Sequence, residues 1–181
     1  MSELFSIQLQ NRQQQGGDGV WLDLPTTTEQ VQAALRQIGI SSDNPQGLFI
    51  SGYFAEEEKR FAISYNMVLA SNVDELNFLA SRLETLSTGE RTELNAALQA
   101  PQSELFSIGR ITDFPENVDY YVHLPDVHGP AQLGDYYLNR SGMVDMPEEW
   151  KGGIDTAQFG RYVAQQEQGA FTQYGYPVKS G

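Results

Sequence analysis

Two histidines with one carboxylate between them are the side chains of this chain best suited to acid–base or metal chemistry. They are His123 and His128, and the carboxylate is Asp126. An imidazole can act as a general base or bind a metal ion, but a metal site needs at least one further ligand in a fixed geometry. The three residues span the junction between an expected strand, which stops at Pro125, and a loop, so they share no common face. We therefore predict no metal site and interpret the histidines as a partly exposed pair.

Adjacent carboxylates offer a second kind of chemistry, because a pair of acids can cleave a glycosidic bond. Asp74-Glu75 and Glu148-Glu149 are such pairs, but each lies near the expected start of a helix, where the helix dipole favours acids without any catalytic role. The chain has no cysteine, and neither a nucleophilic serine turn nor a glycine-rich phosphate loop accompanies these groups. We predict no catalytic residue and no cofactor. A small hydrolase that uses either histidine or a carboxylate pair is the alternative from the enzyme class.

The charge balance of the chain indicates which kind of partner it could bind. The 181 residues include 24 Asp and Glu against 11 Lys and Arg, which gives a formal net charge of −13 at pH 7. Such a balance repels free nucleic acid and anionic membrane surfaces, so we predict binding to neither. Its natural counterpart is a basic protein, including one that itself binds DNA. Many proteins are acidic merely to stay in solution, and an acidic adaptor module for another basic partner therefore stays open as an alternative.

The acidic residues are spread along the chain rather than gathered in one tail. Residues 1–60 hold 8 acids and 4 bases, residues 61–101 hold 5 and 2, and residues 102–181 hold 11 and 5. B-form DNA carries one charge per roughly 1.7 Å of its axis, so 24 carboxylates in a line would match roughly 40 Å of duplex. This distribution is compatible with a protein that imitates the charge of DNA.

The N-terminal sequence and the hydropathy of the chain predict a cytoplasmic protein. The first 15 residues contain no basic segment followed by an apolar stretch, which a secretory signal would need. No run of apolar residues approaches the 18 or so that a membrane-spanning helix requires.

The first part of the chain has the patterns of strands around one helix. Apolar and aromatic residues predict strands at 3–9, 20–24 and 48–54, and a further short strand at 61–65. The sequence from Thr26 to Glu29 is typical of a capping box, and apolar residues at helical spacing follow it up to a terminal glycine.

The middle of the chain predicts two helices. Asn72 can cap the first, and Leu76, Leu79 and Leu83 line one of its faces. The sequence from Ser87 to Glu90 is a second capping box, and a proline ends the helix that follows.

The last third of the chain begins with a repeat of the N-terminal sequence. The sequence of Ser103–Ile108 is identical to that of Ser2–Ile7. The expected strand VWLDLP at 20–25 has a counterpart in YYVHLP at 120–125, and both end in Leu-Pro. We therefore predict that both copies begin with two strands and a helix. A helix capped by Asp155 and an aromatic strand complete this part.

Further positions in the last third are assigned from helical spacing. Two adjacent tyrosines, Tyr136 and Tyr137, follow the helix start at Pro130. Because neighbours on a short helix are not expected to point into the same core, one of them is a candidate contact residue. In the helix after Asp155, Tyr162 is expected on the apolar side, and the terminal strand is expected at 170–176.

These elements predict an elongated α+β protein of three small units. The first is β-β-α-β over 1–66, the second is a small helical unit over 67–101, and the third is β-β-α-α-β over 102–181.

Several blocks of this sequence, taken in order, resemble the ArdA antirestriction family. They are the segments LPDVHGPAQLGDYYL and DTAQFGRYVAQQEQGAFTQYGY, together with GVWLDLP and NVDELNFLASRL nearer the N-terminus. The similarity extends from about residue 20 to residue 176. It implies a homodimeric DNA mimic, encoded on mobile genetic elements, that inhibits type I restriction-modification enzymes and has no catalytic activity of its own.

The resemblance thus implies a site made of many carboxylates that occupies the DNA-binding groove of a restriction-modification enzyme's methyltransferase core. Tyr136 and Tyr137 are the candidate interface aromatics. The expected phosphate-mimicking acids are Asp113, Glu116, Asp119, Asp126, Asp135, Asp145, Glu148, Glu149, Asp155, Asp74, Glu75, Glu56, Glu57 and Glu58.

Overall fold

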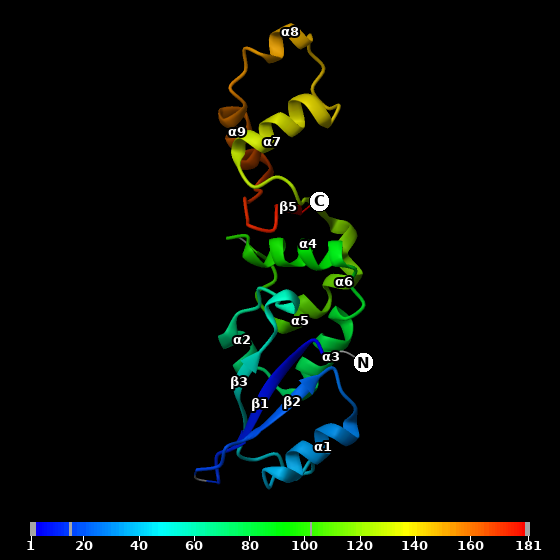
Figure 1. Cartoon of the computed structure of the whole chain (residues 1–181), viewed down its shortest axis with the longest axis vertical. Coiled ribbons are helices and arrows are strands. Elements are labelled where there is room, and N and C mark those ends of the chain that lie inside the picture. The colour runs from blue at the N-terminus through cyan, green and yellow to red at the C-terminus, as the bar shows by residue number, and fades with distance from the viewer. Residues whose placement is uncertain (1–2, 15, 102, 180–181) are drawn as a thin grey trace. The chain divides into compact units, whose positions relative to one another are not determined.

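The computed structural model describes residues 3–14, 16–101 and 103–179 and has the predicted mixed α+β class. Its chain divides into two compact units (Figure 1). Unit 1 comprises residues 1–86 and 105–115, and unit 2 comprises residues 87–104 and 116–181. The two helices of the expected middle unit fall into different units, and the division of the chain into three ranges stays a prediction.

A three-stranded antiparallel sheet forms the frame of unit 1. Its strands are β1 (Phe5–Asn11), β2 (Val20–Leu24) and β3 (Leu48–Phe54), in the order β2-β1-β3. Burial alternates along β1, and Ile7 and Leu9 are completely buried, because successive residues of a strand point to opposite faces. The strands predicted at 3–9, 20–24 and 48–54 are confirmed, and the first of them is shifted by two residues.

Four of the described helices in unit 1 follow a Thr, Ser or Asn residue. The helical segments of this unit include α1 (Thr28–Gln37), the 3-10 turn η1 (Glu57–Lys59), α2 (Tyr65–Leu69), α3 (Val73–Leu83) and α5 (Ile108–Thr112). Helix α6 (Phe114–Asn117) follows α5 directly. The predicted cap of α3 is confirmed, since the Asn72 side chain accepts a hydrogen bond from Glu75 N.

Two local predictions in unit 1 are wrong. Thr27, not Thr26, caps α1 by accepting from Gln30 N. The short strand at 61–65 is absent from the two sheets of the described residues, and α2 begins at Tyr65. Phe61 and Ile63 are both buried and are separated by one residue, so the segment has the alternating apolar pattern of a strand. Its backbone does not pair with either of these sheets.

Unit 2 combines a two-stranded sheet with a group of helices. Strands β4 (Tyr121–Leu124) and β5 (Tyr176–Lys179) pair antiparallel. The helical segments are α4 (Thr88–Gln99), η2 (Val118–Tyr120), α7 (Pro130–Asp135), the π-helical turn η3 (Tyr136–Arg140), α8 (Glu148–Lys151) and α9 (Thr156–Glu167). The predicted capping box of α4 and the Asp155 cap of α9 are both confirmed.

The repeated hexapeptide takes different structures in its two positions, so the predicted second β-β-α unit is wrong. In the first copy Phe5 to Ile7 lie in β1, whereas in the second copy Ser107 caps α5 by accepting from Arg110 N. The residues that follow explain the difference. Gln-Leu-Gln-Asn continues the strand alternation, but Gly109 and Pro115 interrupt it in the second copy. Strand β5 also starts later than predicted, at Tyr176, and a turn occupies residues 172–175.

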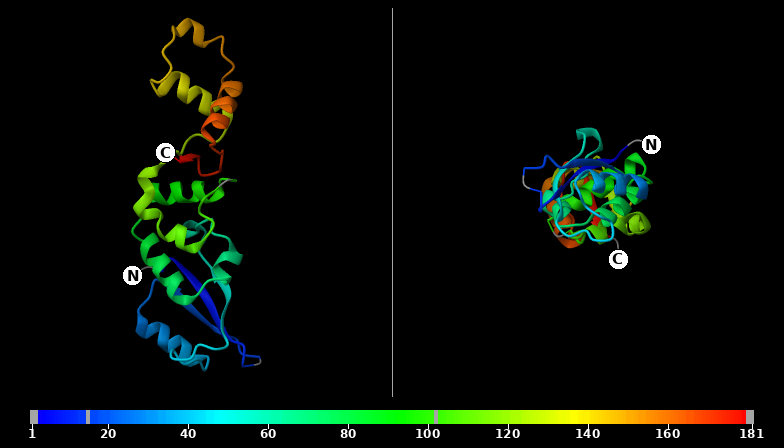
Figure 2. Two further views of the ribbon diagram at one scale, coloured as in Figure 1. Left: turned by 180° about the vertical axis from the view of Figure 1, so that it is seen from behind. Right: turned by 90° about the horizontal axis from the view of Figure 1, so that it is seen from below.

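Helices α7 and α9 cross at unusually short range and lie side by side in Figures 1 and 2. A Cβ atom on Gly134 would overlap the Thr156 carbonyl oxygen, and one on Gly160 would overlap the Pro130 carbonyl oxygen. Two glycines therefore allow the two backbones to touch. Tyr162 of α9, expected on the apolar side of this helix, is 60% exposed.

The core of unit 2 lies beneath this crossing. Val127, Leu133, Ala164 and Tyr176 are buried together. Both adjacent tyrosines of η3 also pack against this cluster, contrary to the expectation that neighbours on a helix cannot share one core. Their rings contact each other edge to face, with centroids 5.4 Å apart.

Candidate functional site

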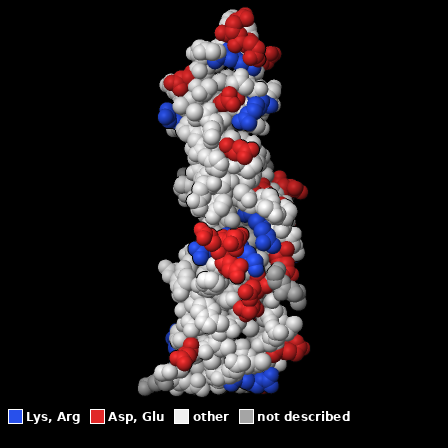
Figure 3. Space-filling model, viewed as in Figure 1, with Lys and Arg blue, Asp and Glu red and all other residues white. Residues whose placement is uncertain are grey.

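The acidic residues expected to mimic phosphates all lie at the surface. Each of the fourteen carboxylates predicted from the sequence is exposed. They are carried by the ends of helices and by loops in both units, and Figure 3 shows acidic patches on the surface of each unit. Unit 1 has 12 acids and 6 bases, and unit 2 has 12 acids and 5 bases, which gives net charges of −6 and −7. Both units are therefore suited to a basic partner.

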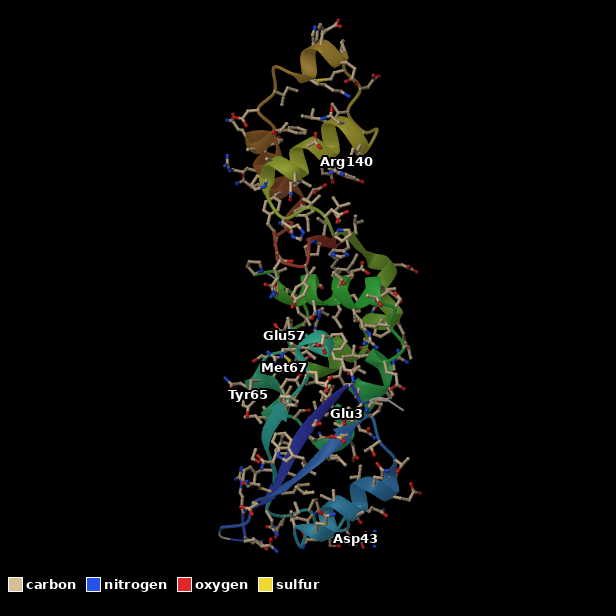
Figure 4. All side chains as sticks on the ribbon, in the orientation of Figure 1. Glu3, Asp43, Glu57, Tyr65, Met67 and Arg140 are labelled. Atoms are coloured by element: carbon tan, nitrogen blue, oxygen red, sulfur yellow. The ribbon has the colours of Figure 1, made fainter. Side chains whose placement is uncertain are left out.

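Some of these exposed acids are engaged in local structure. Glu148 accepts a hydrogen bond from Lys151 Nζ at 3.0 Å, and Asp135 accepts one from Asn139 Nδ2 at 2.7 Å. The guanidinium of Arg140, labelled in Figure 4, lies 3.8 Å from the second oxygen of Asp135. Asp155 accepts hydrogen bonds from two backbone amides at the start of α9. These acids contribute less to an external field, since a neighbouring cation or amide already compensates part of each charge.

Unit 1 contains an acidic cluster that was not predicted. The Ser6 hydroxyl donates a 2.6 Å hydrogen bond to Asp23, which lies directly opposite it in the β1–β2 ladder. This bond and a hydrogen bond with the Glu3 side chain lower the pKa of Asp23. The same contact with Asp23 raises the pKa of Glu3, and the charge of nearby Glu56 adds to that rise. Lys59 is also close, with its Nζ donating to the Glu3 carbonyl oxygen at 3.4 Å.

Sequence reasoning missed this cluster because its members come from separate strands. Serine opposite aspartate is a weak signal on its own, and it becomes visible only once the register of β1 with β2 is known.

Three of the 24 acids are not exposed, and two of them bind groups within their own unit. Glu90 completes the capping box of α4 by accepting from Ser87 N at 2.9 Å, which lowers its pKa. Glu167 accepts hydrogen bonds from the hydroxyls of Tyr137 and Tyr176. The pKa of both tyrosines is raised, first by burial and then by the contact with this carboxylate. Glu93 is buried in α4. Its pKa is raised to about 7 by burial first, and then by the charges of Glu90 and Asp119.

The two histidines hold a turn rather than forming a reactive pair. His123 Nε2 lies 2.8 Å from the Tyr174 carbonyl oxygen, and His128 Nδ1 lies 3.1 Å from the Thr172 carbonyl oxygen. A carbonyl only accepts, so each of these nitrogens carries a proton and donates. Both rings thus fasten the segment between α9 and β5. In the part of the chain that the structure describes, no three His, Cys, Asp or Glu side chains are grouped as metal ligands would be.

The sequence matches the model of a known protein family. The model of a family described as antirestriction protein (ArdA) matches residues 16–178, which is most of the chain. No curated protein matches the sequence. Among the described residues, no helix has the length and apolar character needed to cross a membrane.

Proposed function

This chain belongs to the ArdA antirestriction family, whose non-enzymatic members inhibit type I restriction-modification systems by DNA mimicry, and on that premise we propose that its exposed carboxylates occupy the DNA-binding groove of the target's methyltransferase core. In this proposal each carboxylate takes the place of a DNA phosphate and meets a Lys or Arg that would otherwise bind DNA. The inhibitor then acts by competition and needs no reactive group.

The observation that carries this proposal is the exposure of all fourteen predicted acids on the surfaces of two units that are both strongly negative. An exposed ion pair contributes only about 0–1 kcal/mol, so affinity has to come from many such contacts. Binding should also weaken steeply with salt, as binding of DNA to the same groove does. Loss of any single carboxylate should therefore matter little.

The test compares two fourfold variants with the same charge. One neutralises Asp119, Asp126, Asp145 and Glu149, which belong to the predicted array. The matched control neutralises Asp18, Glu29, Asp43 and Glu84, which are equally exposed but lie outside it. Binding to a purified type I methyltransferase core is titrated at several salt concentrations, with and without competing duplex DNA.

The array variant should bind more weakly by about 2–4 kcal/mol, from half to one per charge, and its dependence on salt should be flatter. The control variant should lose much less. Equal losses in the two variants would show that net charge alone matters, and a core that binds the inhibitor and DNA together would contradict occupation of the groove.

We also propose that the protein acts in the cytoplasm, where its target meets DNA, and that it does so as a homodimer. Tyr136 and Tyr137 support a dimer surface because each keeps part of its ring exposed beside the core of unit 2. Sedimentation at micromolar concentration tests the dimer, and a monomer at that concentration would contradict it.

A further inference from the structure

The outer face of the sheet in unit 1 carries aromatic side chains. The register of β1 places Gln8 opposite Trp21 of β2 and Gly52 of β3, and places Ser6 opposite both Asp23 and Phe54. Residues that face each other in antiparallel strands point to the same side of a sheet. Trp21, Asp23 and Phe54 therefore share one face, while the opposite face is turned to the core.

Both large rings on this face are accessible. Trp21 is 50% exposed and Phe54 is 57% exposed. The indole lies across the central strand, because a Cβ atom on Gly52 would be only 3.0 Å from its Cη2 atom. The absence of a side chain at Gly52 thus leaves room for the indole on this face, where half of its surface stays exposed for stacking.

The same face already binds one guanidinium group within the chain. Phe49 pairs with Gln10 on this side of the sheet, and the Arg12 guanidinium carbon lies 4.9 Å from the centre of the Phe49 ring. This is the distance of a favourable cation–π contact. The surface is therefore chemically suited to arginine side chains that stack on its rings.

Negative charge borders the exposed rings. Asp23 lies on the face itself, and Glu3 and Glu56 line the small crevice beside Phe54 together with Lys59. Figure 4 labels Glu3 at the start of β1 and Glu57 in η1, which adds further acids to unit 1. A cation stacked on Trp21 or Phe54 would thus find a carboxylate within the same patch, whereas an anionic ligand would be repelled.

We propose that this face, defined by Trp21, Asp23, Phe49 and Phe54, docks an arginine-bearing segment of the DNA-binding surface of the restriction-modification enzyme. The inference rests on the proposed function and adds a second kind of mimicry to it. The carboxylates take the place of DNA phosphates. The rings of Trp21 and Phe54 take the place of the DNA bases on which an arginine side chain of the enzyme would stack. The affinity of the complex then has a part that does not depend on the carboxylate charges of this chain.

The first test removes the rings and keeps every charge. Trp21→Ala with Phe54→Ala should raise the Kd for the methyltransferase core about tenfold, as expected for two exposed cation–π contacts. The slope of affinity against salt should stay that of the wild type, since no ion is removed. The conservative variant Trp21→Phe with Phe54→Tyr should bind like the wild type. Tyr162→Ala, which removes an equally exposed ring from unit 2, is the matched control.

The second test observes Trp21 directly in the intact chain. The protein has two tryptophans, so labelling with 5-fluorotryptophan gives two fluorine resonances, and Trp150→Phe assigns them. Addition of the core should shift or broaden the Trp21 resonance, and excess duplex DNA should reverse the change.

The outcomes separate this inference from the proposed function. If the ring variant binds as tightly as the wild type, or the Trp21 resonance does not respond while the core binds, the docking face is overturned and the carboxylate array stands. If sedimentation shows that the ring variant has lost a dimer, the face belongs to a second copy of the chain and the inference is overturned. If the wild type does not bind the core at all, both proposals fail.

Discussion

Replacement of Gly160 by alanine should destabilise unit 2, although alanine is the better helix former. In an exposed helix the change from glycine to alanine stabilises by about 1 kcal/mol. At Gly160 the new Cβ would overlap the Pro130 carbonyl oxygen, lie 2.6 Å from the carbonyl carbon, and lie 3.0 Å from Gly134 N. These are backbone atoms, so relief requires α7 and α9 to move apart.

The magnitude follows from two opposing effects. Overpacking of a tight contact typically costs about 1–3 kcal/mol, and more when the backbone has to shift. Separation of the helices also loosens Leu133 and Ala164, which are buried beneath the crossing. After the gain in helix propensity is subtracted, we expect the free energy of unfolding to fall by about 2 kcal/mol.

The measurement is urea unfolding followed by circular dichroism, with Gly89→Ala as the matched control. Gly89 also lies in a helix of unit 2, but no atom lies within 4 Å of the position of its Cβ, so alanine there should stabilise by about 0.5–1 kcal/mol. Opposite signs at the two sites are the expected result. A Gly160→Ala variant that is as stable as the wild type would show that α7 and α9 do not touch through their backbones.

Three further predictions concern side chains outside the proposed carboxylate array. Glu93→Gln should stabilise the protein above pH 7 by on the order of 1 kcal/mol and flatten the fall in its stability between about pH 4.5 and 7. In that range the carboxyl group ionises in the unfolded chain but keeps its proton in the folded one, so the wild type loses stability as the pH rises. An unchanged profile in pH-dependent unfolding would contradict this. Tyr176→Phe should cost about 1–2 kcal/mol in urea unfolding, because it removes one of the two hydroxyls that bind Glu167. Replacement of both His123 and His128 by Gln should leave inhibition intact in a restriction assay and cost about 1–3 kcal/mol of stability; a large loss of inhibition in the folded variant would revive a catalytic role.

Short-range signals in the sequence were enough to predict many helix starts and strands. The Ser87–Glu90 box and the caps at Asn72 and Asp155 involve residues within three positions of each other, so the chain carries the whole interaction locally. The hexapeptide at Ser103–Ile108 failed as a predictor because a strand needs a partner. Its N-terminal copy pairs with β2 and β3, and the second copy lies in another environment.

The candidate site was likewise predictable only where it depends on residue type and not on tertiary packing. Exposure of the carboxylates followed from residue type, since ionised side chains rarely lose their water. The contacts that acids make within the protein could not be predicted from residue type. The contact of Glu167 with two tyrosines and that of Glu3 with Asp23 depend on tertiary packing. The α-helical period does not predict the packing of the adjacent tyrosines of η3, because Tyr136–Arg140 form a π-helical turn.

The path of the chain through its two units has a consequence for how such a protein can be divided or recombined. The polypeptide leaves unit 1 after residue 86, contributes α4 to unit 2, returns with α5, and crosses again after residue 115. Ile108, Ile111 and Phe114 are buried after that return. A cut in the gene after residue 86 therefore leaves these three core side chains out of the N-terminal piece, and a cut after residue 115 keeps unit 1 whole but separates α4 from the rest of unit 2. Exchange of segments between related genes would preserve both cores only if two separate stretches were exchanged together.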